Sequence, residues 1–216
     1  MFKRLSILFV GLALTAACSA HPAGDASAAT YTEGQQYVAT TTPARIDKND
    51  GKVEVVEVFS YGCVHCAHYE EYAEKLQKEL PKGVVFRAVP AAFNDAWKPY
   101  AQAYYAAKAL KVDPASHAAL FKAIHTDHYP LRTIEELADW YKANYAVDPA
   151  KFIATATGKV VTDQIEKDTK VIQEWGIDGT PTIVVDGKYR SGQIKNFDEL
   201  NGVAKYLVDK ELKGNK

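Results

Sequence analysis

Runs of apolar and polar residues divide most of the chain into strands and helices. Val53–Phe59 is apolar at nearly every position, which predicts a central strand that is buried on both faces. An amphipathic helix over Cys66–Leu80 is predicted from apolar residues at helical spacing: Tyr69, Tyr72, Ala73, Leu76 and Leu80. Pro81-Lys82-Gly83 ends this helix, and Val84–Pro90 predicts the next strand. A strand, helix and strand of these lengths predict a crossover that joins two parallel strands.

The pattern is helical throughout from Asp95 to Trp175. It predicts a bundle of helices over Asp95–Leu110, Pro114–Thr126, Thr133–Tyr145 and Pro149–Trp175, the last of them broken near Gly158. Thr133-Ile134-Glu135-Glu136 has the sequence of a capping box. Asp113 and Asp148 each precede a proline, which predicts two further helix starts with a capping acid.

Strand signals return after Gly176. Pro181 opens an apolar run, Asp186-Gly187 predicts a hairpin turn, and a partner strand follows the turn. Residues 197–212 predict a closing amphipathic helix, and a short apolar patch at Tyr37-Val38 predicts an edge strand. The expected fold is therefore α/β, with a helical insertion between its two strand-containing parts.

Residues 1–17 have the pattern of a bacterial export signal, with a basic start and an apolar stretch too short to span a bilayer. Leu14-Thr15-Ala16-Ala17-Cys18 resembles a lipobox, which would make Cys18 the acylated N-terminus, although Thr15 departs from that motif. Cleavage at Ala26-Ser27-Ala28 is the alternative and would remove Cys18. We expect a spacer over residues 18–36 and a periplasmic location, with a lipid tether as one of the two outcomes.

The charge and the cysteine content restrict the class of protein. The chain has 216 residues and a net charge of −1, which becomes −3 without Lys3 and Arg4 of the leader. It contains no basic stripe, so we do not expect it to bind nucleic acid. Of its three cysteines, only Cys63 and Cys66 lie outside the leader region. A lone, closely spaced pair in an exported protein favours catalysis over structure, because a bridge that closes so small a loop adds little stability.

The pair Cys63-Val64-His65-Cys66 follows a predicted strand and begins a predicted helix, with Gly62 permitting the turn between them. A helix N-terminus has unpaired N–H groups and a partial positive charge, which lower the pKa of a cysteine placed there. Protonated His65 would stabilise the same thiolate at Cys63. A disulfide whose reduced form is stabilised in this way is a strong oxidant, and Cys66 would be its shielded partner.

Glu57 is an anomaly in its apolar strand. Burial would raise the pKa of its carboxyl, which could then exchange protons with the thiol of Cys66. The alternative is an edge strand on which Glu57 faces water, as Glu54 is expected to do. Alternation places Glu57 on the same face as Val55 and Phe59, which favours burial.

The order of the elements, with the cysteine pair opening the first helix and a proline opening the later hairpin, is similar to the thioredoxin fold. The large helical insertion resembles the DsbA family of periplasmic thiol oxidases. Four local strings also resemble that family: Tyr31-Thr32-Glu33-Gly34, Val56-Glu57-Val58-Phe59-Ser60, Leu80-Pro81-Lys82-Gly83-Val84 and Asp186-Gly187-Lys188-Tyr189. The resemblance implies a thioredoxin-like domain in two parts, residues 37–92 and 174–216, around a helical domain at residues 93–173.

The resemblance also implies the roles of individual residues. Cys63 corresponds to the nucleophile, Cys66 to the resolving cysteine, His65 to the histidine that stabilises the thiolate, and Glu57 to a buried acid. Thr180-Pro181 corresponds to a cis-proline loop that binds the substrate backbone; a simple start of an edge strand is the alternative. The implied partners are reduced, newly exported polypeptides and a quinone-linked membrane oxidase of the DsbB type. No cofactor is implied beyond the redox-active disulfide.

Two positions depart from the family pattern. Val64 replaces the proline commonly found between the cysteines, and the dipeptide there tunes the redox potential. Phe86-Arg87-Ala88 occupies the region where the family often has a lysine near the buried acid, so the charge partner of Glu57 stays open.

Three other functions are compatible with parts of the sequence. A copper or zinc site could use Cys63, His65 and Cys66, with His125 and His128 as further ligands, but three ligands on one turn rarely complete a tetrahedral shell. A reductase or isomerase could share the fold; the chain has no obvious dimerisation domain, so we expect a monomer, which counts against an isomerase. The intact cysteine pair argues against a non-catalytic peptide-binding module.

Overall fold

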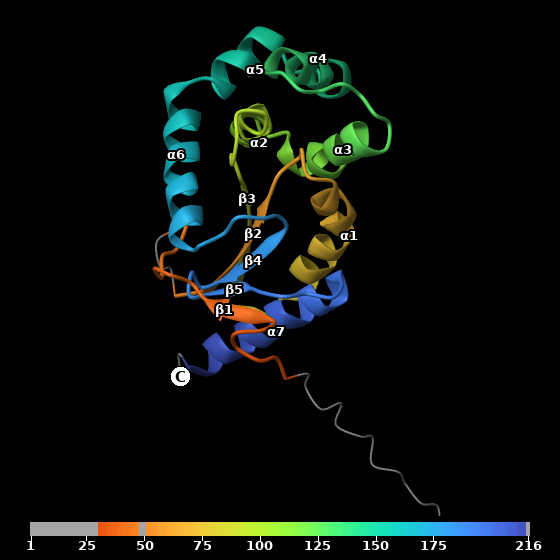
Figure 1. Cartoon of the computed structure of the whole chain (residues 1–216). Coiled ribbons are helices and arrows are strands. Elements are labelled where there is room, and N and C mark those ends of the chain that lie inside the picture. The colour runs from red at the N-terminus through yellow and green to blue at the C-terminus, as the bar shows by residue number, and fades with distance from the viewer. Residues whose placement is uncertain (1–29, 48–50, 215–216) are drawn as a thin grey trace, which may run out of the picture.

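A five-stranded sheet with the order β1-β5-β4-β2-β3 forms the centre of the protein (Figure 1). The computed structural model describes residues 30–47 and 51–214. The strands are β1 (Tyr37–Ala39), β2 (Val53–Phe59), β3 (Val84–Pro90), β4 (Thr182–Val185) and β5 (Tyr189–Ser191). β2 is parallel to β3 and antiparallel to β4, and every residue of β2 is buried. The central strand predicted from this apolar run is therefore confirmed.

Helices cover both faces of the sheet, and alternation along β2 sends its side chains to both layers. Val55 packs against α1 (Val64–Glu79) and α7 (Phe197–Gly214), while the next residue, Val56, packs against α6 (Lys159–Glu174). Burial of apolar area on the two faces is the main favourable contribution to folding. The sheet thus fixes which residues of β2 point toward α1, the helix that begins at the cysteine pair.

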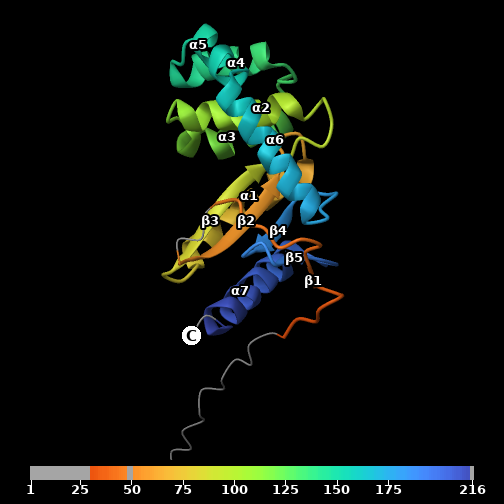
Figure 2. The ribbon, with the colours of Figure 1, turned by 90° about the vertical axis from the view of Figure 1, so that its left-hand side faces the viewer.

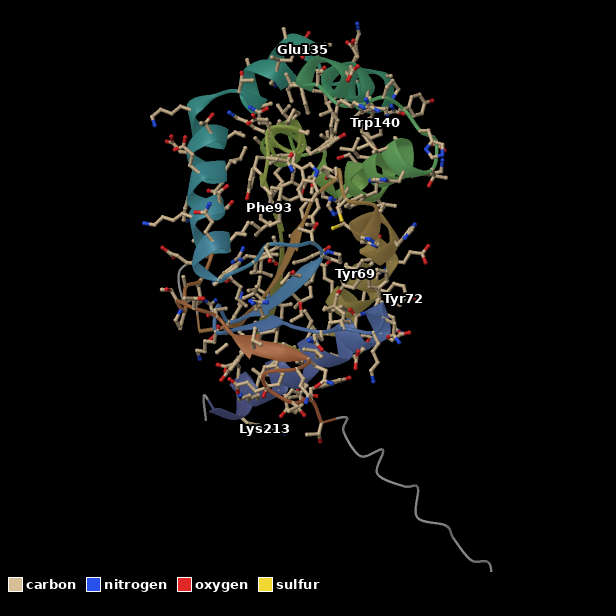
Figure 3. The ribbon with its side chains drawn as sticks, in the orientation of Figure 1. Tyr69, Tyr72, Phe93, Glu135, Trp140 and Lys213 are labelled. Atoms are coloured by element: carbon tan, nitrogen blue, oxygen red, sulfur yellow. The ribbon has the colours of Figure 1, made fainter. Side chains whose placement is uncertain are left out.

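Aromatic side chains join α1 to α7, and Figure 3 shows Tyr69 and Tyr72 at this contact. The ring of Phe197 lies 5.2 Å from that of Tyr69 and 5.4 Å from that of Tyr72, measured between centroids. The Tyr69 hydroxyl donates to Asn201 Oδ1 at 2.7 Å, and Asn201 Nδ2 donates to the Tyr72 carbonyl at 2.9 Å. The buried polar groups of this contact are therefore paired.

A block of helices lies between β3 and β4 in the sequence. It consists of α2 (Lys98–Ala109), α3 (Asp113–His125), α4 (Ile134–Tyr145) and α5 (Pro149–Ala156), after which α6 returns to the sheet. Figure 2 shows the block beyond the end of the sheet at which β2 and β3 finish. The break predicted near Gly158 is confirmed, because α5 ends at Ala156 and Gly158 is the N-cap of α6.

Most of the predicted helix starts match the structure. The Thr133 hydroxyl accepts a hydrogen bond from Glu136 N at 3.2 Å, and the Glu136 carboxylate accepts one from Thr133 N at 2.9 Å, which completes the capping box of α4. Asp148 caps α5 by accepting from Lys151 N at 2.8 Å. The capping role predicted for Asp113 is wrong, because α3 begins at Asp113 itself.

The start of α2 also differs from the prediction. The helix begins at Lys98, three residues later than the predicted start at Asp95. Asn94 and Trp97 close a turn there, with Trp97 N donating to both the Asn94 carbonyl at 3.0 Å and Asn94 Oδ1 at 3.1 Å. An asparagine side chain that binds the backbone in this way favours a turn over helix.

The expectation that Glu54 faces water is wrong. Its side chain is fully buried, and its carboxylate accepts hydrogen bonds from Arg87 Nε at 2.9 Å and from Ile46 N at 3.1 Å. Arg87 also contacts Asp47 at 2.9 Å. A buried carboxylate persists when it is paired and hydrogen-bonded, and Arg87 supplies that pairing across the β2–β3 ladder.

The first described residues pack against α7. The ring of Tyr31 meets that of Tyr206 edge-on at a centroid distance of 5.7 Å, and Gly202 leaves the space that the Tyr31 hydroxyl occupies. In Figure 1 this end of the chain lies on the α7 side of the sheet, away from the helical block. The predicted signal at residues 1–17 and the lipidation predicted at Cys18 lie outside the described residues. None of the helices in the described ranges is long and apolar enough to cross a membrane.

Candidate active site

The two cysteines lie at the start of α1, directly after β2. Cys63 is the N-cap of the helix, and Cys66 is buried in its first turn. The connecting loop is held by Cys63 N, which donates to the Ser60 carbonyl at 3.0 Å, and by Gly62 N, which donates to Ser60 Oγ at 3.1 Å. The sulfur of Cys63 therefore lies beside the unpaired N–H groups of a helix N-terminus.

Gly62 is needed in this loop because of its close neighbours. A Cβ at position 62 would lie 2.9 Å from both Trp97 Nε1 and Tyr100 Cε2. Trp97 is the N-cap of α2 and Tyr100 lies in its first turn, so any larger residue would force the cysteine loop and the helical block apart. The glycine thus provides space, which the sequence-based argument about a sharp turn does not include.

The two thiols, free in this structure, differ strongly in acidity. The pKa of Cys63 is lowered to about 5, first by a hydrogen bond from the Cys66 thiol, and further by the Thr180 hydroxyl and the backbone N–H groups of Cys66 and His65. Burial opposes this effect at Cys63, whereas at Cys66 it raises the pKa well above the usual range. Cys63 therefore ionises first, and the Cys66 thiol stays protonated and donates a hydrogen bond to the Cys63 sulfur.

His65 lies between the cysteines with its side chain on the surface. Its backbone N–H is among the groups that lower the pKa of Cys63. The stabilisation of the thiolate by a protonated His65 imidazole stays a prediction. A solvent-exposed charge stabilises a neighbouring anion less than a buried one would, because water screens it.

The loop Thr180-Pro181 faces the cysteine pair, and the peptide bond between these two residues is cis. The Cys63 thiol donates to the Thr180 carbonyl at 3.4 Å. Thr180 Oγ1 is buried and has no hydrogen-bond partner within the described part of the chain. A thiolate at Cys63 would give this hydroxyl an acceptor, which is how Thr180 lowers the pKa of Cys63.

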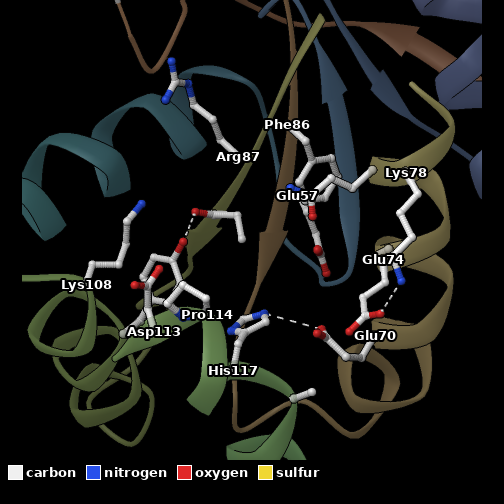
Figure 4. Close-up of a pocket in the computed structure, with 15 residues that line it drawn as sticks. Glu57, Glu70, Glu74, Lys78, Phe86, Arg87, Lys108, Asp113, Pro114 and His117 are labelled. Carbon is white, nitrogen blue, oxygen red and sulfur yellow. Dashed lines mark hydrogen bonds and ion pairs between the residues drawn. The ribbon is translucent and has the colours of Figure 1, made fainter. Parts of the chain in front are cut away.

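Glu57 is buried, as the alternation along its strand predicts. Its pKa is raised to about 8, mainly by burial, and also by the nearby negative charges of Glu70 and Cys63. The carboxyl borders a cavity of about 500 Å³ between the sheet, α1 and α3, which Figure 4 shows with Glu70 and His117 on its wall. Glu57 is therefore neutral through most of the physiological pH range and able to give up or take a proton near its upper end.

Comparison with known proteins places this geometry in a family. A sequence model of the thioredoxin family matches residues 39–203. The thiol:disulfide interchange protein DsbA of Pseudomonas aeruginosa is 37% identical over 188 residues, covering 86% of this chain and 88% of that protein. DsbA of Burkholderia cepacia is 35% identical over 193 residues, covering 89% and 88% of the two chains. The chain belongs to the DsbA family.

Solved structures agree with this membership. The crystal structure of the oxidoreductase DsbA from Xylella fastidiosa superimposes with a TM-score of 0.79 at 37% identity, over 83% of this chain and 97% of that one. DsbA of Pseudomonas aeruginosa gives a TM-score of 0.78 at 36% identity, over 85% and 96%. The thioredoxin-like fold and the thiol:disulfide interchange activity expected from the sequence are thereby confirmed.

The sequence analysis missed a histidine that joins the DsbA-like cysteine loop to the helical block. His117 of α3 contacts the buried Tyr61 hydroxyl through Nδ1 at 2.7 Å and Glu70 Oε2 through Nε2 at 3.4 Å. If Nε2 carries the proton, it points to the carboxylate and Nδ1 accepts from the tyrosine, so both contacts are satisfied by one tautomer. The sequence contained one signal for this role of His117, which is its position among the apolar residues of a predicted helix.

A second histidine has a related role. His125 Nε2 donates to the Tyr61 carbonyl at 2.7 Å, two residues before Cys63. In the sequence analysis His125 is a candidate metal ligand, together with His128. Within the described ranges, no three His, Cys, Asp or Glu side chains are grouped so as to hold a metal ion. The observed bond supports a structural role for His125 at the cysteine loop.

The dipeptide between the cysteines presents an apolar residue to an approaching protein. Val64 is 45% exposed at the start of α1, where it stands in place of the proline common in the DsbA family. Its side chain adds apolar area beside Cys63 without entering the core. The effect of Val64 on the redox potential stays a prediction.

Proposed function

We propose that the chain is a dithiol oxidase that donates a Cys63–Cys66 disulfide to reduced, newly exported polypeptides. The observation that carries this proposal is the low pKa of Cys63, about 5, beside a Cys66 whose pKa is raised. Stabilising the Cys63 thiolate stabilises the reduced protein relative to the disulfide, and a disulfide with a favoured reduced form oxidises its partners. The same observation disfavours a reductase, which needs the opposite balance.

The reaction moves two electrons from the substrate to the cysteine pair. A substrate thiolate attacks Cys63 Sγ, the Cys63–Cys66 bond breaks, and Cys66 leaves as a thiolate and takes a proton. A second substrate thiolate then attacks the substrate sulfur of the mixed disulfide and displaces Cys63 as a thiolate. The substrate leaves with a new disulfide, and the protein is left with a thiolate at Cys63 and a thiol at Cys66.

Other residues of the site have proposed roles in these steps. Glu57 supplies the proton that Cys66 takes up, which its raised pKa and buried position support. The Thr180 hydroxyl and the positive end of α1 stabilise the departing Cys63 thiolate. His65 adds to this stabilisation when it is protonated, and Pro181 keeps the Thr180 backbone facing the substrate.

The proposal also covers location and partners. An export signal at residues 1–17 would deliver the protein to the periplasm, where Cys18 either carries a lipid or is removed. A quinone-linked membrane protein of the DsbB type would restore the disulfide, so that no cofactor other than the cysteine pair is needed. Labelling with a fatty acid, with Cys18→Ala as the control, separates the two outcomes at position 18.

Equilibration of the purified protein with glutathione tests the oxidase assignment. We expect the cysteine pair to stay reduced in mixtures that oxidise an ordinary dithiol, and Cys63→Ser to abolish the oxidation of reduced peptides. Cys66→Ser, which keeps Cys63 but lacks the resolving thiol, should instead accumulate a mixed disulfide between Cys63 and glutathione when oxidised glutathione is supplied. A pair that is harder to reduce than glutathione disulfide would identify a reductase and refute the proposal.

A further inference from the structure

A groove beside the cis-proline loop carries a charge that the proposed function does not explain. It is a cavity of about 570 Å³, bordered on one side by Thr180 and Pro181. His65 lines it next to the cysteine pair, and the Thr180 carbonyl lies 3.4 Å from the Cys63 sulfur. We call it the cis-proline groove; Thr180 belongs both to this groove and to the surroundings of the Cys63 sulfur.

One wall of the cis-proline groove is apolar. It is formed by four side chains from α1, from the segment before α7 and from α7 itself: Tyr72, Ile194, Phe197 and Leu200. Phe197 meets Tyr72 edge-on, so this wall is fixed by the contact between α1 and α7. Such a wall can hold an apolar side chain of an extended peptide.

The charged residues of the groove are mostly cationic. Arg190 of β5 and Lys195 of the following segment line it, against a single acid, Asp178. This excess is local, since the whole chain has a net charge of −1. The cavity at Glu57 has no such excess, because three cations, Lys78, Arg87 and Lys108, line it together with the acids Glu57, Glu70, Glu74 and Asp113.

The two cations are available to a ligand. Neither Arg190 nor Lys195 forms a salt bridge with any residue in the described ranges. Asp198 and Glu199, the acids closest to Lys195 in the sequence, do not line the groove, and Glu199 accepts a hydrogen bond from the Lys195 backbone N–H. Arg190 is half-buried, and its Nε lies 3.9 Å from where a Cβ would stand on Gly176.

From this arrangement we propose that the cis-proline groove selects extended cysteine-containing segments in which an acidic side chain and an apolar side chain lie close to the reacting cysteine. The acid binds between Arg190 and Lys195, and the apolar side chain packs on the Phe197 wall. The inference rests on the proposed function, because the segment is the substrate of the oxidation, and it adds a preference among substrates. Opposite charges across such a rim act chiefly on the rate of association and on specificity.

Three reduced dithiol peptides provide the test. All three contain a leucine next to the first cysteine. They differ only in the two residues on either side of this leucine–cysteine pair, which are both Glu, both Gln or both Lys. The rate of peptide oxidation by the oxidised wild-type protein is measured after acid quenching. We expect the Glu peptide to react about three to ten times faster than the Lys peptide at low salt, which is the range that two exposed ion pairs can supply. This ratio should fall toward one at high salt.

Substitutions assign the effect to the groove. Arg190→Gln with Lys195→Gln should bring the Glu-to-Lys rate ratio close to one, and Arg190→Glu with Lys195→Glu should invert it. Lys82→Gln is the matched control and should leave the ratio unchanged, because Lys82 lies in the turn before β3, at the opposite end of β2 from Cys63. Circular dichroism checks that each variant is folded. If a double variant does not fold, the salt dependence of the wild-type rate ratio tests whether charge selects the peptide.

The outcomes separate the two proposals. Oxidation of all three peptides at equal rates by the wild type would overturn the charge selection and leave the oxidase assignment standing. A rate ratio that survives the double Gln substitution would overturn the assignment to Arg190 and Lys195. Failure to oxidise even the Gln peptide would overturn the proposed function, and the inference with it.

Discussion

Glu57 of β2 lies opposite Ala88 of β3, so the buried carboxyl beside the cysteines faces a methyl group across the parallel strands. The arginine of the same strand, Arg87, points to the other face and binds Glu54 at 2.9 Å. Burial and the charges of Glu70 and Cys63 then act on Glu57 without a compensating cation, and its pKa rises to about 8. This relationship distinguishes the site from one in which a lysine accompanies the buried acid.

Ala88→Lys should lower the pKa of Glu57. The new ammonium group would extend into the cavity of about 500 Å³ that both residues line, and an adjacent positive charge stabilises a carboxylate. We expect the pKa of Glu57 to fall by about one unit or more, and carbon NMR of the labelled carboxyl measures this change. Ala88→Met, which adds similar volume without charge, should leave the pKa raised. Equal pKa values in the two variants would mean that the position does not control the acid.

Thr180→Val should raise the pKa of Cys63 by about one pH unit, because it removes a hydrogen bond to a charged sulfur while keeping the shape of the side chain. The thiolate absorbance at 240 nm measures this pKa. His65→Leu should have a smaller effect, since the His65 ring is exposed and its backbone N–H stays in place. If the histidine variant had the larger effect, the imidazole and not the hydroxyl would be the main stabilising group.

The stability of the reduced protein should depend on pH in a way that the oxidised protein does not share. The pKa of Cys63 is about 5 in the folded reduced protein and near 9 in an unfolded chain, so the folded thiolate contributes stability at neutral and higher pH. That contribution is lost as the pH falls through 5. Thermal unfolding of both redox forms between pH 4 and pH 8 should show that the stability of the reduced form increases relative to that of the oxidised form as the pH rises. A constant difference would contradict the lowered pKa.

Gly62→Ala should destabilise the protein by about 1 to 3 kcal/mol, because the added methyl group would overlap Trp97 and Tyr100 and force them to move. Denaturant unfolding measures the cost. Gly179→Ala is a suitable control, since a Cβ there meets no atom within 4 Å and the residue lies in the same half of the site. Similar stabilities for the two variants would show that the cysteine loop can shift without cost.

Features that depend on neighbouring residues in the sequence could be predicted. β2, the capping box at Thr133 and the break at Gly158 follow from local patterns, and the structure contains all three. The burial of Glu57 followed from alternation alone. These predictions succeed because strand alternation and helix caps involve residues within a few positions of one another.

Features that depend on strand register or on helix packing could not be predicted. Glu54 is buried because the register of β2 and β3 brings Arg87 to its carboxylate, and no local pattern contains that register. His117 reaches Tyr61 across 56 positions in the sequence, through the packing of α3 on the cysteine loop. The charge of the cis-proline groove likewise combines a strand residue, Arg190, with Lys195 from the segment before α7.

The docking of Tyr31 beside Gly202 sets the direction in which any upstream attachment would pull. That point lies on the α7 side of the sheet, whereas Cys63 lies where the sheet meets the helical block. If Cys18 carries a lipid, the connection to the membrane would start from the α7 side of the domain. The Cys63 sulfur would then face away from the membrane, toward newly exported polypeptides. To bring the cysteine pair to an oxidase embedded in the same bilayer, the whole domain would have to reorient relative to its attachment point.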